Sequence, residues 1–338
     1  MIPNMQRQWL INDRPIGRHL RDDDFKAAEG PVRAPEPGEV LLRTLYLGFD
    51  PALKGWMENV ANYVAPTQIG DVMRGSGVAQ VIRSNDPKFK EGDIVSGQFG
   101  WQEYPTVAAA GLARAPDGAP PTANLGVLGT TGMTAYFGLL DIGKPIAGDT
   151  VVVSGAAGAT GSVVGQIAKI AGCRVIGIAG GAAKCDWLVR ELGFDAAVDY
   201  KTQSIRDRLK DLAPGGANVV FDNVGGAVLN DLLACLAMRA RVVICGGISR
   251  HSTGGKTLGP ENYFNIVFMR ARMEGFILLD YVARYSEAQD RLLRWIRDGR
   301  LQYKEDVQIG FENAPRTLMR LFQGENFGKQ LLKVADPT

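Results

Sequence analysis

Residues 150–172 read TVVVSGAAGATGSVVGQIAKIAG, and this stretch decides the fold. The apolar run at 150–154 is typical of a parallel strand that is covered on both faces. A turn with three glycines follows it, and residues 162–171 then have the pattern of a helix: the glycines are Gly155, Gly158 and Gly161. Such a turn lets a dinucleotide pyrophosphate approach backbone N–H groups at a helix N-terminus, where the helix dipole favours anions. The alternative is a turn that serves only the packing of the helix on the sheet.

The residues after this unit alternate between strand-like and helix-like segments. Strand-like runs lie at 174–178, 196–199, 218–222 and 241–245. Helical patterns separate them, at 184–192 and 204–212 and in a leucine-rich stretch before residue 241. Repeated strand–helix–strand units predict a doubly wound parallel sheet. Ahead of the first strand, residues 125–140 have the spacing of a buried helix.

The first 120 residues have a different pattern, with short strands separated by turn signals such as Glu36-Pro37-Gly38. This pattern predicts a compact β-rich domain, and the Pro- and Gly-rich segment at 115–121 marks its boundary. The chain ends in one more strand-like run, at 329–334, which could return to the first domain. We therefore predict a β-rich domain over 1–123, completed by about 308–338, and an α/β domain over 124–307.

Composition excludes several classes of protein. The chain has 338 residues, which at about 150 residues per domain indicates two domains. Lys and Arg number 38 against 36 Asp and Glu, so the net charge of +2 gives no support to nucleic-acid binding. No uncharged run reaches the ~20 apolar residues of a membrane span, and residues 1–20 lack the apolar core of a signal peptide.

The rare metal-binding residues point the same way. The chain has two histidines and four cysteines, and no two cysteines have CxxC spacing. A structural zinc site needs four ligands, usually in closely spaced pairs, so we expect no metal site. Few and scattered cysteines also fit a reducing cytoplasm better than a disulfide framework.

The type of nicotinamide cofactor follows from the end of the second strand. A site for NAD usually carries an Asp or Glu about 20 residues after the glycines, where it binds the ribose 2′-hydroxyl. Residues 178–184 read IAGGAAK, with no carboxylate and a lysine at Lys184. A 2′-phosphate would be attracted by Lys184, so the sequence favours NADP(H). The alternative is that Lys184 is an ordinary surface residue of the helix.

These motifs together resemble a known family. The run from 151 to 193 is joined by VVFDNVGG at 219–226, CGGIS at 245–249, RMEGF at 272–276, GFENAP at 310–315 and GENFGK at 324–329. With GFDP at 48–51 and GTTGMTAY at 129–136, the set is similar to the zinc-independent medium-chain dehydrogenases/reductases. Within that family it most resembles the leukotriene B4 dehydrogenase, prostaglandin reductase and curcumin reductase group.

The resemblance implies a fold and an activity. It implies a GroES-like β-rich domain, completed by the C-terminal segment, and a Rossmann domain with a doubly wound parallel sheet. It also implies NADPH-dependent reduction of the C=C bond of small apolar α,β-unsaturated ketones and aldehydes, without a metal, usually by a homodimer. Two alternatives remain open: a quinone reductase of the neighbouring branch, and a non-catalytic NADP-binding redox sensor.

Site residues are carried over from the family position by position. The pyrophosphate would be held at Gly158, Ala159, Thr160 and Gly161. The adenosine end would meet Lys184 and Tyr200. The remaining cofactor contacts would come from Met133, Thr134, Asn223, Cys245, Gly246, Gly247, Ile248, Ser249, Phe276, Ile277, Leu278 and Asn326. For Cys245, a small buried residue is a simpler interpretation than a catalytic one.

The source of the proton is where the sequence departs from the family. Many members carry a tyrosine at the position of Phe268, and a phenylalanine can donate neither a proton nor a hydrogen bond. Two other tyrosines could serve, Tyr63 and Tyr263, and each could equally be a half-buried structural tyrosine. Water is a further candidate. We expect Tyr63 to donate to the carbonyl oxygen of the substrate.

Overall fold

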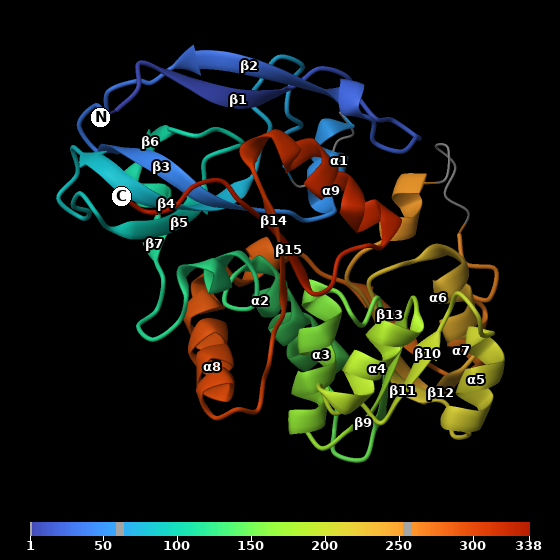
Figure 1. The fold of residues 1–338 in the computed structure, drawn as a ribbon. Helices are drawn as coiled ribbons and strands as arrows, with labels where there is room; N and C mark the ends of the chain where they lie inside the picture. Colours follow the sequence, from blue (N-terminus) through green and yellow to red (C-terminus); the bar gives the residue numbers. More distant parts are fainter. Residues whose placement is uncertain (1, 59–63, 253–258) are drawn as a thin grey trace. The chain divides into compact units, whose positions relative to one another are not determined.

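The computed structural model describes residues 2–58, 64–252 and 259–338 of the chain (Figure 1). Contacts divide the chain into two compact units. Unit 1 comprises Met1–Gly126 and Glu305–Thr338, and unit 2 comprises Val127–Lys304. Unit 1 is thus built from both ends of the chain. No helix among the described residues is long and apolar enough to cross a membrane.

Unit 1 is a mostly antiparallel β structure. Its larger sheet has the order β14-β15-β3-β4-β5-β7, with β6 also paired to β3. The strands are β3 (Glu39–Gly48), β4 (Ser76–Ser84), β5 (Ile94–Gln98), β6 (Thr106–Ala108), β7 (Ala113–Arg114), β14 (Glu305–Ile309) and β15 (Lys329–Lys333). A separate hairpin pairs β1 (Met5–Ile11) with β2 (Phe25–Pro31). The helices of this unit are α1 (Ala52–Met57) and α9 (Ala314–Gln323).

The core of unit 1 is aromatic and aliphatic. The Trp101 ring is fully buried and stacks on Phe25, with ring centroids 5.5 Å apart. Helix α9 contributes an apolar face that includes the buried residues Leu318 and Leu321. The strand predicted at 329–334 is confirmed as β15, because it pairs antiparallel with β3 of the N-terminal segment.

Unit 2 contains a six-stranded parallel sheet in the order β10-β9-β8-β11-β12-β13. The strands are β8 (Thr150–Ser154), β9 (Arg174–Ala179), β10 (Ala196–Asp199), β11 (Ala217–Asp222), β12 (Leu236–Ile244) and β13 (Arg272–Gly275). Counted from β8, this is the order 3-2-1-4-5-6 of a doubly wound dinucleotide-binding sheet. The predicted α/β fold with its parallel sheet is confirmed.

The helices of unit 2 are α2 (Thr130–Phe137), α3 (Ala159–Ile170), α4 (Ala182–Arg190), α5 (Ile205–Leu212), α6 (Gly226–Leu233), α7 (Asn265–Phe268) and α8 (Tyr285–Arg297). Helices α3 to α7 connect successive strands of this sheet, whereas α2 precedes its first strand and α8 follows its last strand. Ser204 caps α5, because its hydroxyl accepts a hydrogen bond from the Asp207 N–H. Helix α8 buries Leu292, Leu293 and Trp295 on one face, as its sequence pattern requires.

One predicted helix begins later than expected. The sequence indicated a single helix over 125–140, but a short 3₁₀ helix ends at Leu125 and α2 begins only at Thr130. Gly126 and Gly129 both adopt non-helical conformations between them. The loop then folds back on the helix so closely that a Cβ on Gly132 would lie 1.8 Å from the Val127 carbonyl oxygen. Periodicity alone does not reveal this tertiary contact.

Candidate dinucleotide-binding site

The loops predicted to bind a cofactor follow the carboxyl ends of the parallel strands. The strand order of unit 2 changes direction between β8 and β11, whose last residues are Ser154 and Asp222. Ligands of doubly wound folds bind outside the carboxyl ends of the strands, at this switch point. The glycine-rich turn follows β8, Asn223 follows β11, and residues 245–249 follow β12. The fold therefore brings these three segments together at the carboxyl ends of the parallel strands.

The glycine-rich turn has the backbone geometry of an anion cradle. Gly155 has φ +59°, a conformation that side chains disfavour. Gly158 is the N-cap of α3 and provides no side-chain hydrogen bond to it. A Cβ on Gly161 would lie 2.4 Å from the Gly155 carbonyl oxygen, so only glycine fits there. The first turn of α3 thus has no side-chain cap, and its N–H groups suit a pyrophosphate.

A buried carboxylate holds the turn and the next loop together. Asp222 is fully buried, and its oxygens accept hydrogen bonds from the Ser154 hydroxyl at 2.6 Å and from the N–H groups of Val224 and Gly225 at 3.2 and 2.9 Å. The Ser154 hydroxyl oxygen in turn accepts from the Asn223 N–H at 2.9 Å, and the Asn223 amide donates to the Ser154 carbonyl at 2.7 Å. Burial raises the pKa of Asp222. The sequence reasoning missed Ser154 and Asp222, which end two otherwise apolar strands.

The loop after β12 is tied to the same network. The N–H of Cys245 donates to the Asp222 carbonyl at 2.9 Å, and both the N–H and the hydroxyl of Ser249 donate to the Val224 carbonyl, at 3.1 and 2.6 Å. Burial, with a contribution from the Asp222 charge, raises the pKa of the Cys245 thiol to about 12. This thiol therefore stays protonated at neutral pH and is a poor nucleophile.

The adenosine end carries more positive charge than the sequence reasoning recognised. Lys184 lies in the first turn of α4, directly after β9. The N–H of Tyr200 donates to the Ala179 carbonyl, which brings the loop after β10 beside the end of β9. A Cβ on Gly180 would lie 2.9 Å from the Tyr200 hydroxyl and 3.0 Å from Cε of Lys201. Lys201 thus joins Lys184 and Tyr200 at the end of β9.

The acidic residue beside this cluster is engaged by backbone groups. Asp199 accepts hydrogen bonds from the N–H groups of Gly181 at 2.9 Å and Lys201 at 3.0 Å. The Gly181 N–H is the largest cause that lowers the pKa of Asp199. Its charge therefore shapes the loop and is not placed where an NAD site has its ribose-binding acid, at the end of β9.

Other predicted cofactor residues lie near the carboxyl ends of the strands. Residues 276–278 follow β13 directly, so they extend beyond the same ends of the sheet. The Phe276 ring packs on Gly138 at the C-terminal end of α2, since a Cβ on Gly138 would lie 2.4 Å from Cζ of Phe276. Met133 and Thr134 lie in α2, which packs against α3.

Two positions that the sequence singled out lie away from these loops within unit 2. Tyr263 lies two residues before α7 and Phe268 is the last residue of α7, and they are 59% and 62% exposed. The side chain of Asn265, in α7, donates to the carbonyl of Leu233 at the far end of α6, so α7 lies toward the amino ends of the strands. Asn326 belongs to unit 1, where its side chain bonds the Gly328 carbonyl. Tyr63 lies outside the described residues.

No metal cluster accompanies this site. Across the residues that the structure describes, no group of three His, Cys, Asp or Glu side chains could hold an ion. All four cysteines are free thiols.

Comparison with known proteins agrees with this architecture. Residues 7–115 match a model described as the N-terminal domain of oxidoreductase, and residues 159–296 match one described as zinc-binding dehydrogenase. A putative NADP-dependent oxidoreductase of Bacillus subtilis is 44% identical over 98% of this chain and 99% of its own. The 2-alkenal reductase (NADP(+)-dependent) of Nicotiana tabacum is 39% identical over 99% of each chain. The crystal structure of CurA with NADPH from Vibrio vulnificus superposes with a TM-score of 0.92, at 37% identity, over 98% of this chain and 100% of that one.

A doubly wound sheet with a glycine-rich turn at its switch point is the architecture of a dinucleotide-binding protein, and the matching models describe an oxidoreductase and a dehydrogenase. The chain belongs to the medium-chain dehydrogenase/reductase family, in the group that contains the curcumin, prostaglandin and 2-alkenal reductases.

Proposed function

We propose that this protein is an NADPH-dependent reductase of the C=C bond of α,β-unsaturated ketones and aldehydes. The observation that carries the proposal lies at the carboxyl ends of the parallel strands of unit 2. The glycine-rich turn follows β8 there, and the end of β9 carries lysines but no acid that would bind the ribose 2′-hydroxyl. Full-length relatives whose names specify NADP and 2-alkenals support the same activity. The test is oxidation of NADPH, with NADH in parallel, in the presence of enones, 2-alkenals, quinones and saturated ketones. Turnover of quinones alone would contradict the proposal.

The roles of the residues follow from the chemistry of conjugate reduction. When bound, NADPH supplies a hydride to the β-carbon of the substrate. The turn at 158–161 would hold the pyrophosphate, and Asn223, residues 245–249 and residues 276–278 would orient the ribose and nicotinamide. By the family resemblance, Asn326 would also contact the cofactor. Negative charge develops on the carbonyl oxygen during the reaction, so a hydrogen-bond donor aimed at that oxygen accelerates it most.

Tyr63 is our candidate for that donor. The Tyr63→Phe variant should lower kcat/KM for an enone roughly 100-fold, the lower end of the usual contribution of a general acid. The Kd for NADPH should not change, because the substitution removes only a hydroxyl on the substrate side. The measurements are steady-state kinetics and a fluorescence titration with NADPH.

Tyr263→Phe is the matched control, since it removes the same hydroxyl from an exposed tyrosine just before α7. We expect it to leave kcat/KM unchanged. Wild-type kcat/KM in Tyr63→Phe would exclude Tyr63 as the donor and leave water as the source of the proton.

We also infer that the protein is a cytoplasmic homodimer. The free cysteines support the reducing compartment. Among the strands that the structure describes, β13 is an edge strand of the parallel sheet, and all four of its residues are exposed. Large exposed apolar side chains precede and follow it: Phe264, Val267, Phe268, Leu279 and Val282. An open edge flanked by apolar groups favours pairing with a second copy about a twofold axis.

A charged residue introduced into the proposed interface tests whether the protein is a dimer. Val267, which is 60% exposed, should not tolerate a carboxylate in an apolar interface, so Val267→Asp should be a monomer in light scattering. Ile146, 67% exposed and elsewhere in unit 2, is the control, and Ile146→Asp should remain a dimer. A wild-type monomer at micromolar concentration would contradict this inference.

A further inference from the structure

A short 3₁₀ helix, η6 (Leu278–Arg284), follows directly after the residues that we expect beside the nicotinamide. None of its seven residues is buried, so packing into the core does not fix its position. The Asp280 N–H donates to the Ile277 carbonyl at 3.1 Å, which joins the first turn of η6 to the residue before it. Residues 276–278 and η6 therefore form one continuous piece, and the contacts that hold η6 also hold the nicotinamide side of the site.

The ring of Tyr281, in the middle of η6, links this piece to α2. It stacks on the Phe137 ring, with centroids 4.4 Å apart and an angle of 19° between the planes. Its edge-to-face neighbour is the Phe276 ring, at 6.4 Å and 81°. Both arrangements are favourable for aromatic pairs. Phe137 is fully buried and is the last residue of α2, so Tyr281 joins Phe276 to the core of unit 2.

Arg284, the last residue of η6, lies over this stack. Its guanidinium carbon is 5.0 Å from the centroid of the Phe137 ring and 5.9 Å from that of the Tyr281 ring, within the range of cation–π attraction. The same guanidinium pairs with Glu287 at 2.8 Å and also with Asp141. These two carboxylates lie in α8 and in the helical segment after α2, so Arg284 ties η6 to both.

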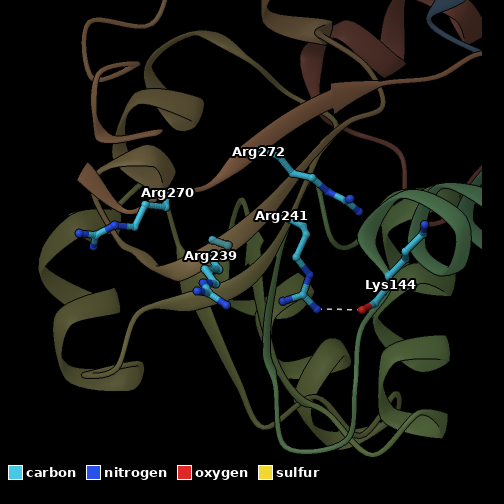
Figure 2. Close-up of a pocket in the computed structure, with 6 residues that line it drawn as sticks. Lys144, Arg239, Arg241, Arg270 and Arg272 are labelled. Atoms are coloured by element: carbon cyan, nitrogen blue, oxygen red, sulfur yellow. Dashed lines mark hydrogen bonds between the residues drawn. The ribbon is translucent and has the colours of Figure 1, made fainter. Parts of the chain in front are cut away.

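The helical segment after α2 is itself fixed to the sheet. It runs over Gly138–Gly143 as a continuation of α2. The Arg272 guanidinium donates to the Ile142 carbonyl at 2.6 Å, and the Arg241 guanidinium donates to the Lys144 carbonyl at 2.8 Å. Figure 2 shows both arginines, with the second of these bonds as a dashed line. Because Arg241 lies in β12 and Arg272 in β13, two strands anchor the segment against which η6 is held.

We propose that Tyr281 is a positioning residue for the nicotinamide half of the cofactor. Its ring holds residues 276–278 against α2, the helix that carries the predicted contacts Met133 and Thr134. This inference rests on the proposed function, which puts these residues beside the nicotinamide. A segment that is held in place before binding spares the cofactor the cost of ordering it, and hydride transfer depends on that placement.

Two ligands distinguish positioning from general damage. NADPH extends over the whole site, whereas adenosine 2′,5′-bisphosphate has only the adenosine end and lacks the nicotinamide half. Tyr281→Ala should raise the Kd for NADPH about tenfold, because the ring contacts to Phe137 and Phe276 are lost and binding must then order residues 276–278. The Kd for the bisphosphate should not change, since the end of β9 is unaltered. Calorimetric titration measures both values.

Tyr281→Phe is the matched control, because it keeps the ring and should bind both ligands as the wild type does. Arg284→Gln is a second variant that opens no cavity, since the Arg284 side chain is 44% exposed. It should raise the Kd for NADPH about threefold and leave that for the bisphosphate unchanged. All three variants should have the wild-type mass in light scattering, because the exposed Leu279 and Val282 that we assign to the dimer interface are unaltered.

The proposal is overturned if folded Tyr281→Ala binds NADPH as tightly as the wild type, if it loses affinity for both ligands equally, or if Tyr281→Phe is impaired as much as Tyr281→Ala. If Tyr281→Ala does not fold, the two titrations of Arg284→Gln decide in the same way. Failure of the proposed function gives a different result: the wild type would bind NADPH and reduce no enone, and these titrations contain no enone.

Discussion

Removal of both lysines at the adenosine end should abolish the preference for NADPH. In the Lys184→Ala, Lys201→Ala double variant we expect the ratio of kcat/KM for NADPH to that for NADH to fall about 100-fold. Each lysine should supply one charge-assisted contact to the 2′-phosphate, and the loss of such a contact corresponds to about tenfold. The values for NADH itself should hardly change, because NADH has no 2′-phosphate. The measurement is steady-state kinetics with both cofactors and a single enone.

Lys210→Ala is the matched control, since it removes an exposed lysine on α5 that pairs with Asp207. Its cofactor preference should equal that of the wild type. The single variants separate the two contributions, and Lys201→Ala tests the residue that only the structure revealed. An unchanged preference in the double variant would show that other groups recognise the phosphate, and the assignment of this end would fail.

Replacement of Asp222 by alanine should remove cofactor binding and destabilise unit 2. The substitution leaves the Ser154 hydroxyl and the N–H groups of Val224 and Gly225 without their acceptor. One unsatisfied buried group costs about 1–3 kcal/mol, so we expect roughly 3 kcal/mol of lost stability. The glycine turn and the loop after β11 would lose their common support, and the Kd for NADPH should rise about 100-fold, close to the same free energy.

The Asp222→Asn variant separates the effect of the carboxylate charge from that of the side-chain shape, because asparagine has nearly the same shape and no charge. Burial raises the pKa of Asp222, so the native state holds this proton to a higher pH than the unfolded chain, whose pKa is about 3.9. The wild type therefore loses stability relative to Asp222→Asn as the pH rises from below that value through the raised pKa. The asparagine variant keeps an acceptor for the Ser154 hydroxyl and the Val224 N–H but turns its NH2 group toward the Gly225 N–H, so it should recover only part of the NADPH binding. Wild-type NADPH affinity in Asp222→Ala, measured on the folded protein, would show that the network does not position the loops.

Much of this architecture follows from local sequence. The strand, glycine turn and helix at 150–172 have one compatible arrangement, because a buried strand, positive φ at Gly155 and an apolar helix must succeed one another. The alternation of strands and helices after it specified the parallel sheet. The return of β15 to β3 was also anticipated, from one apolar run near the C-terminus.

The features that sequence reasoning missed depend on contacts between distant residues. Asp222 looks like an ordinary end of a strand until the fold brings Ser154, 68 residues earlier, to its carboxylate. Lys201 became a candidate only because β10 pairs with β9, so that the loop after β10 lies against Gly180 at the end of β9. The emphasis on Phe268 rested on its place in a motif, and the structure instead puts it on α7, toward the amino ends of the strands.

The fate of the hydride tests the central claim most directly. NADPH that carries deuterium at the nicotinamide C4 should be given to the wild-type protein with an enone, and the product analysed by NMR. We predict a saturated ketone with deuterium at the β-carbon and a solvent-derived proton at the α-carbon. An allylic alcohol with deuterium at the former carbonyl carbon would contradict the account, because it would show reduction of the C=O bond.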